Sequence, residues 1–131
     1  MNRNWQVATT NGDLAAIGLL ARDSRTLNSR DEHGQTALMN ASKSGALAVV
    51  QLLVALGANL DAAAKYGLTA LMLAIVNGHR DVARCLIVAG ADLARTGSGA
   101  PGFAGKTALD LARARGQHDL CALIEERSRT T

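Results

Sequence analysis

Aromatic residues are almost absent from this chain of 131 residues, which has one Trp, one Tyr and one Phe. A β-sandwich or β-barrel needs β-branched and aromatic residues at alternating positions, so this composition argues against both folds. The same scarcity removes the stacking platform that single-stranded nucleic acid requires. Ala and Leu supply most of the hydrophobic residues, which make up 48% of the chain and favour closely packed helices.

Cysteine is also scarce, since the chain has only Cys85 and Cys121. Two cysteines are too few for a disulfide scaffold, and they lack the paired spacing of a zinc site. His118 and Cys121 stand three residues apart, but two ligands without a second pair are a weak metal signal. We therefore expect no metal site and interpret both cysteines as small, buried apolar side chains.

No apolar run reaches the length of a membrane span, and the apolar stretch at residues 14–21 is too short for one. The N-terminus does not resemble a signal peptide, so we expect a cytoplasmic protein with no membrane partner. The net charge is +3, but the basic residues are spread over both halves of the chain. No basic stripe follows a phosphate backbone, and we expect no direct binding to nucleic acid.

The chain repeats itself at a shift of 33 positions. The matches include Gly34 with Gly67, Thr36 with Thr69, Leu38 with Leu71, Gly45 with Gly78 and Gly57 with Gly90. A degenerate copy precedes these units, and the register resumes after 38 positions, with Thr69 matching Thr107. About five residues are thus inserted near 96–103. We predict one domain of four units, over residues 1–30, 31–63, 64–96 and 102–127.

Each unit has the signals of two short helices joined to a turn. In the second unit Gly34 supplies a positive φ to the turn, and Thr36 is placed to cap a helix that starts at Ala37. That helix stops at Gly45, and a second apolar helix follows before Gly57. Neither helix would persist alone in water, so the units must stack on one another.

These units resemble ankyrin repeats. The resemblance is carried by Asp31-x-x-Gly34-x-Thr36-Ala37-Leu38 and Gly57-Ala58-Asn59, and by their copies around residues 67–71 and 90–92. It covers nearly the whole chain and implies an all-α ankyrin-repeat solenoid of about four helix-turn-helix units with atypical terminal caps. Where the family has His after the capping Thr, this chain has Met39, Met72 and Asp110. We therefore expect the family's Thr–His hydrogen bonds to be absent.

The two end units differ from the inner ones, as the ends of a stack should. Trp5 stands where a bulky side chain would close the first end, and the last helix, expected over residues 119–126, ends in charged residues. We expect from these features a complete, free-standing protein.

Two enzyme-like features have simpler explanations. Residues 100–107 nearly match a phosphate-binding loop, but the preceding segment is a repeat connector and not the buried strand that such a loop requires. We therefore expect no nucleotide and no other cofactor. His33, His79 and His118 occupy different repeat positions, with no nucleophile and acid at a recognisable spacing. We expect no enzymatic activity, and interpret His79 as structural.

The resemblance implies that the turns and the first helices form a concave binding face. The candidate protein-binding residues are Glu32, His33, Gln35, Met39, Lys43, Lys65, Tyr66, Leu68, Met72, Val76, Asn77, Phe103 and Lys106. We expect an apolar centre with polar flanks, in which Tyr66, Met72, Lys65 and His33 contribute most to binding. Two alternatives are that Leu68 and Met72 pack between neighbouring turns, and that the loop carrying Phe103 folds back on the stack.

The predicted function is non-catalytic recognition of a protein partner by a monomer. Two alternatives use the same face. One is a dedicated inhibitor or neutraliser of a toxin or enzyme, and the other is a regulatory accessory of an enzyme.

Overall fold

The computed structural model describes residues 1–99 and 102–129, and within them the chain forms helices without a named strand. The helices are α1 (Arg3–Asn11), α2 (Leu14–Leu20), α3 (Ser24–Leu27), α4 (Ala37–Ser44), α5 (Leu47–Ala55), α6 (Ala70–Val76), α7 (Arg80–Ala89), α8 (Ala108–Ala114) and α9 (His118–Arg129), with the 3-10 turn η1 (Lys65–Gly67). In the described ranges no helix is long and apolar enough to cross a membrane.

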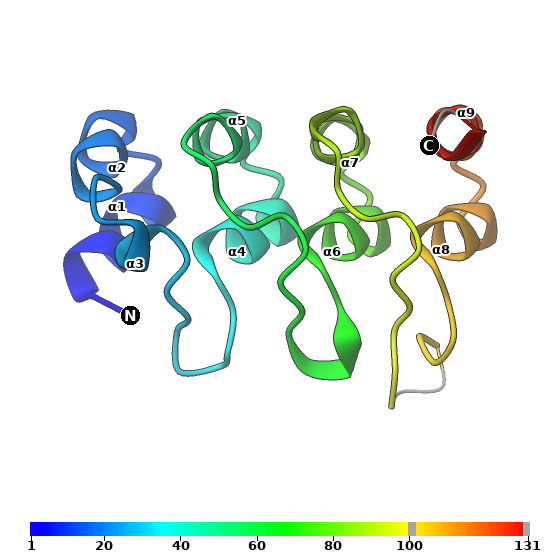
Figure 1. Ribbon diagram of the computed structural model, residues 1–131, viewed down its shortest axis with the longest axis horizontal. Coiled ribbons are helices and arrows are strands. Elements are labelled where there is room, and N and C mark those ends of the chain that lie inside the picture. Colours follow the sequence, from blue (N-terminus) through cyan, green and yellow to red (C-terminus); the bar gives the residue numbers. More distant parts are fainter. Residues whose placement is uncertain (100–101, 130–131) are drawn as a thin grey trace.

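Two parallel rows of helices form an elongated stack (Figure 1). The inner row is α1, α4, α6 and α8, and the outer row is α2, α5, α7 and α9. Each inner helix contacts the next inner helix and its own outer partner. The protein is therefore the all-α solenoid that the repeat predicts, with the connecting loops extending from one side of the inner row.

The inner helices begin in the way the sequence predicts. The hydroxyl oxygens of Thr36 and Thr69 accept hydrogen bonds from the backbone N–H groups of Met39 and Met72, both at 3.3 Å. In the last unit Asp110 adds a second half to the cap, since its carboxylate accepts from the backbone N–H of Thr107 at 3.0 Å and from its hydroxyl at 3.1 Å. An acid thus takes the place of the family's His in this one unit.

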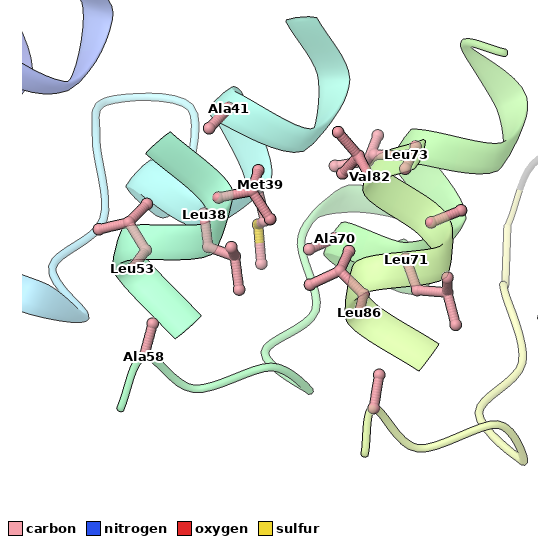
Figure 2. Close-up of a cluster of buried hydrophobic side chains, with 14 of the residues drawn as sticks. Leu38, Met39, Ala41, Leu53, Ala58, Ala70, Leu71, Leu73, Val82 and Leu86 are labelled. Atoms are coloured by element: carbon pink, nitrogen blue, oxygen red, sulfur yellow. The ribbon is translucent and has the colours of Figure 1, made fainter. Parts of the chain in front are cut away.

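Small and branched apolar residues fill the space between the rows. Figure 2 shows Leu38 and Leu53 in one unit beside Leu71 and Leu86 in the next, with Met39 between the two helix pairs. All five side chains are at most 2% exposed. Because each unit completes its core with atoms from its neighbour, the stack folds as a whole.

Polar side chains also connect neighbouring units. The ring Nε2 of His79 donates to the carbonyl oxygen of Lys43 at 3.0 Å, and the amide of Gln117 donates to the carbonyl oxygen of Ile75 at 3.2 Å. The Asp61 carboxylate accepts from the backbone N–H of Asp92 at 2.7 Å. All three bonds join neighbouring units, and the bond from Gln117 satisfies a buried backbone oxygen that water does not reach.

The first end of the stack differs from the expectation in part. Trp5 is fully buried, so its ring lies inside the stack, and the outward face carries exposed Val7, Leu14 and Leu19. At the other end α9 extends to Arg129, three residues beyond the expected end. The last helix thus offers a longer, charged outer surface.

Candidate functional site

Three loops, here called fingers, join the helix pairs and extend away from the inner row (Figure 1). They are the first finger (residues 28–36), the second finger (residues 56–69) and the third finger (residues 90–107, described except for 100 and 101). All three extend from the same side of the inner row, beside one another along the stack.

The same pair of backbone hydrogen bonds closes each finger. In the first finger the N–H of Asp31 donates to the oxygen of Gln35 at 2.8 Å, and the N–H of Gly34 donates to the oxygen of Asp31 at 3.0 Å. Ala64, Gly67 and Leu68 repeat this pattern in the second finger, and Gly97, Gly105 and Lys106 repeat it in the third. The third finger keeps the closure around its longer tip, so the inserted residues lie between Gly97 and Gly105.

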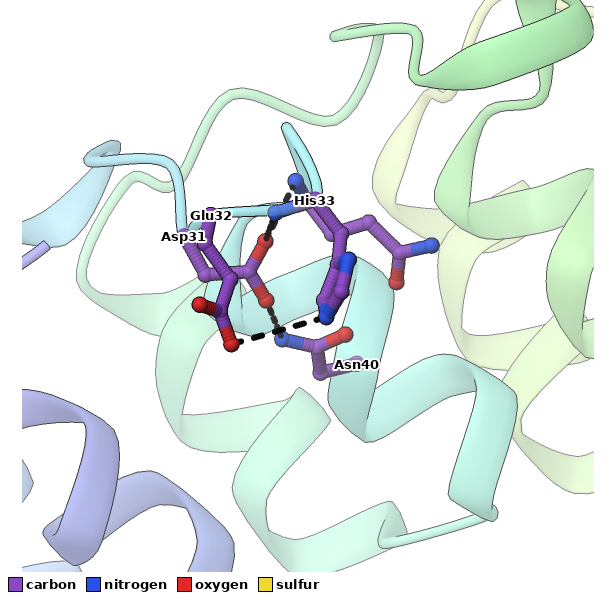
Figure 3. Close-up of polar contacts among 5 residues, drawn as sticks. Asp31, Glu32, His33 and Asn40 are labelled. Carbon is purple, nitrogen blue, oxygen red and sulfur yellow. Dashed lines mark hydrogen bonds and ion pairs between the residues drawn. The ribbon is translucent and has the colours of Figure 1, made fainter.

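A carboxylate holds the tip of the first finger (Figure 3). Asp31 accepts from the backbone N–H groups of His33 and Gln35 at 2.9 and 3.0 Å, and from the side-chain amide of Asn40 at 3.1 Å. Burial opposes the charge of Asp31, but these hydrogen bonds outweigh it and lower the pKa of its carboxyl group. The exposed Glu32 lies 3.6 Å from the His33 ring, an ion pair when that ring is protonated.

The second finger lacks this carboxylate, since Ala64 stands in the position of Asp31. Its tip residue Tyr66 adopts φ +64°, the one positive φ of a non-glycine residue in the described ranges. A large side chain at such a φ is strained and needs outside support. That support comes from the third finger, where the N–H of Ser98 donates to the oxygen of Tyr66 at 2.7 Å.

The side chains at these two tips also meet. The rings of Tyr66 and Phe103 lie 6.3 Å apart, centroid to centroid, at an angle of 32°. The Lys65 ammonium lies 5.0 Å from the Tyr66 ring centroid, within the range of a cation–π contact. Tyr66 is 39% exposed and Phe103 is half-buried against the core. An aromatic pair is thus presented to solvent with a cation beside it.

The apolar centre that the sequence predicts is wrong in three of its members. Met39 and Met72 are each 1% exposed and Leu68 is 8% exposed, so they cannot contact a partner directly. The capping bonds of Thr36 and Thr69 place both methionines in the first helical turn. Figure 2 shows Met39 between its own helix pair and the next one. The burial of Leu68 and Met72 agrees with the alternative in which both pack between neighbouring turns.

The other candidates remain on or near the surface. Exposed are Glu32, His33, Lys43, Lys65, Tyr66, Asn77 and Lys106, and half-buried are Gln35, Val76 and Phe103. One open depression brings together Glu32, His33, Gln35, Lys43 and Lys65, with Asp31 and Asn40. Val76 and Asn77 end α6 and do not line this depression, and the amide of Asn77 donates to the oxygen of Leu73.

Arg30 is a residue that the repeat did not reveal. Its guanidinium donates to the carbonyl oxygen of Gly34 at 2.6 Å and to that of Ala63 at 3.0 Å, which ties the first finger to the second. The equivalent positions in the next units are Ala63 and Thr96, so no repeated pattern marks the arginine. Its position next to the turn of the first finger was the only signal.

The resemblance to a phosphate-binding loop does not extend to the geometry. The N–H groups of Gly97, Gly105 and Lys106 all donate to carbonyl oxygens within the third finger, and the Thr107 hydroxyl bonds to Asp110. A phosphate cradle needs such groups to converge on the ligand. Residues 100 and 101 of the motif lie outside the described residues, and the described part of the loop is closed by its own hydrogen bonds.

Metal binding and thiol reactivity have little support in the described residues. They contain no group of three His, Cys, Asp or Glu side chains that could hold a metal ion. Burial raises the pKa of the Cys85 thiol, which disfavours the reactive thiolate. His33, His79 and His118 lie in the first finger, before α7 and at the start of α9.

A protein-family model matches most of the chain. The family model described as ankyrin repeats, in three copies, matches residues 5–97. The curated proteins include none that matches the chain. Helices α8 and α9 lie beyond the matched residues, yet the same Thr cap and finger closure precede them.

Proposed function

Because the chain belongs to the ankyrin repeat family, we propose that it is a non-catalytic module that binds a protein partner through its fingers and the exposed side of its inner helices. Ankyrin repeats are generally protein–protein interaction modules and are typically non-catalytic. The observation that carries the proposal is the tip of the second finger, where a strained, exposed Tyr66 is held in place by the third finger. Strain of this kind is concentrated at functional sites.

The outer helices are a weaker candidate for this contact. Arg84 and Asp119 form a 2.9 Å ion pair between α7 and α9, and Arg80 approaches the same carboxylate at 3.9 Å. The ion pairs of Asp119 with Arg84 and Arg80 would have to break before these side chains could bind a partner. On the finger side, the depression lined by His33, Lys43 and Lys65 is open. Exposed aromatic and basic side chains beside a depression are typical of interface centres.

We include all of residues 1–131 in one domain with the four unit boundaries given above. The equal capping of α4, α6 and α8 by Thr36, Thr69 and Thr107 supports the fourth unit. The setting that we propose is a monomer in the cytoplasm. Cys85 and Cys121 are both free thiols, which suits a reducing compartment.

A co-precipitation experiment in the source cell tests the proposal. The bait is the wild-type chain, a Lys65→Gln/Tyr66→Ala variant, or a Val88→Ser variant that changes an exposed residue of α7. We expect the same proteins with wild type and Val88→Ser, and their loss with the finger variant. Equal recovery by all three baits would refute the assignment of the binding face.

The stoichiometry of the same experiment separates the forms that this function can take. One partner at a one-to-one ratio would favour the dedicated inhibitor or neutraliser, or the accessory of a single enzyme. Several partners at lower ratios would favour a general adaptor.

A further inference from the structure

Two fingertips combine aromatic surface with positive charge. We call Lys65, Tyr66, Phe103 and Lys106 the tip patch. Lys65 lies over the Tyr66 ring, Tyr66 contacts Phe103, and the backbone N–H of Lys106 donates to the oxygen of Phe103 at 3.0 Å. The hydrogen bond from Ser98 to Tyr66 joins the second finger to the third, and the two ring contacts and the Lys106–Phe103 bond bring the four residues together without a partner. A preformed patch binds at a lower entropic cost than one that must be assembled.

In the described ranges the two lysines of the patch are not held in ion pairs, although the charge of Lys106 helps to stabilise the Asp110 carboxylate. The chain has three lysines, Lys43, Lys65 and Lys106, and all are exposed. Over residues 1–99 and 102–129, no ion pair reaches any of the three. Some arginines do have carboxylate partners, such as Arg113 with Glu125 at 3.0 Å. The lysines of the tip patch can therefore pair with a partner without first breaking an ion pair.

We propose, on the basis of the function given above, that the tip patch binds an acidic segment of the partner protein. An apolar side chain of that segment packs on Tyr66 and Phe103, and its carboxylates pair with Lys65 and Lys106. Charge complementarity of this kind steers association and selects partners, and aromatic contacts supply most of the affinity. Lys43 of α4 lines the neighbouring depression with Lys65, but Asp31 and Glu32 also line it, so the acidic segment is placed on the tip patch and not in the depression.

The neighbouring charges favour a short peptide over a nucleic acid. The first finger presents Asp31 and Glu32, which would repel a phosphate backbone that continued along the fingers. Tyr66 and Phe103 also lie against each other, whereas bases stack on separate, open ring faces. A peptide segment that binds only the second and third fingers does not approach Asp31 or Glu32, and it does not need separate ring faces for stacking.

A peptide selection tests the proposal directly. A random peptide library displayed on phage is selected on the wild-type chain and, in parallel, on a Lys65→Gln/Lys106→Gln variant. We expect wild type to enrich peptides rich in Asp and Glu with one aromatic or aliphatic residue. We expect the variant not to enrich them. Enrichment of peptides without an acidic bias, or no enrichment, would overturn the acidic-segment proposal.

An enriched peptide is then measured by fluorescence anisotropy. We expect the double lysine variant to weaken binding about tenfold, equivalent to ~1.4 kcal/mol, and high salt to weaken it too. Phe103→Ala should also weaken binding, while Arg22→Gln, which removes a charge from the first unit, should leave it unchanged. Displacement of the peptide by an equal concentration of oligouridylate would overturn the proposal in favour of a general polyanion site.

The outcomes separate this proposal from the function on which it rests. Neutral peptides that lose affinity with Phe103→Ala would support the finger interface and refute its preference for acid. Peptides unaffected by any substitution in the tip patch would refute both.

Discussion

The imidazole of His79 lies directly against the backbone of Gly45 in the preceding unit. A Cβ atom at Gly45 would be 2.5 Å from the Nδ1 atom of His79, closer than any ordinary contact. The other ring nitrogen of His79 bonds to the carbonyl oxygen of Lys43 at 3.0 Å. One side chain thus fills the junction between two units, and only glycine leaves room for it.

Replacing Gly45 by Ala should therefore destabilise the protein more than the same change at Gly78. The two glycines are equivalent in the repeat, with φ of +79° and +78°, but a Cβ at Gly78 meets nothing within 4 Å. Both changes carry the backbone strain of a positive φ, and Gly45→Ala adds a collision that should cost about 1–3 kcal/mol more. Urea denaturation of both variants measures the difference.

A double-mutant cycle identifies the cause. In a His79→Ala background the collision is removed, so Gly45→Ala should cost no more than Gly78→Ala. An excess cost that persists in that background would show that the ring of His79 is not responsible.

The junction between the first two units lacks this contact and should accept it. Ala46 is the equivalent of His79, and Gly12 is the equivalent of Gly45. Gly12 and Ala46 line an open pocket with Thr10 and Val49. An Ala46→His substitution should place a ring over Gly12 and raise the free energy of unfolding by about 1 kcal/mol. Ala48→His, at an exposed site of α5, is the control, and an equal effect of both would contradict the account.

The repeat in the sequence predicts most of these local features. The glycine register located the finger turns and the ends of α4 and α7, and Thr36, Thr69 and Thr107 located the helix starts. Each of these depends on a few neighbouring residues, so a linear pattern is sufficient. The resemblance to ankyrin repeats then indicated how the units stack, which combines these helices and turns into one fold.

Features that depend on contacts between units were harder to predict. Met39 and Met72 follow the cap by three residues, and a helix has two neighbours in a stack, so exposure cannot be assigned from one helical face. The positive φ of Tyr66 has no marker in the sequence, because the residue before Gly67 is held by Ser98 of the next finger. Arg30 is unique to its unit and therefore invisible to the repeat.

We expect the strained backbone at Tyr66 to lower the free energy of unfolding. Asn tolerates a positive φ better than Tyr, so Tyr66→Asn should leave the free energy of unfolding unchanged or raise it by up to about 1 kcal/mol. The same substitution should reduce partner recovery. Tyr66→Phe, which keeps the ring and the strain, is the control for the first effect. A large loss of stability in Tyr66→Asn would show that Tyr66 is a packing residue.

The cap of α8 should be sensitive to acid. Hydrogen bonds from the backbone and hydroxyl of Thr107 lower the pKa of Asp110 below its ordinary value, so the folded state holds the proton less tightly than the unfolded chain. Its contribution to stability is thus present above that ordinary value and is lost as the pH falls through the lower, folded-state pKa. The midpoint temperature of thermal unfolding should therefore decrease when the pH is lowered below about 4.

An Asp110→Asn variant checks the source of that change. It should be less stable at neutral pH and lose less on acidification, whereas Glu126→Gln, an exposed change on α9, should follow wild type. Identical acid profiles for wild type and Asp110→Asn would contradict the role of this cap.

Site-specific photo-cross-linking in the source cell tests the central claim, that the fingers are the surface that binds protein. A photoreactive phenylalanine analogue replaces either Tyr66, at the tip of the second finger, or Val88, which is 53% exposed on α7. The account predicts a discrete cross-linked protein from position 66 and none from position 88. Cross-links from position 88 alone would place the partner on the outer helices and contradict it.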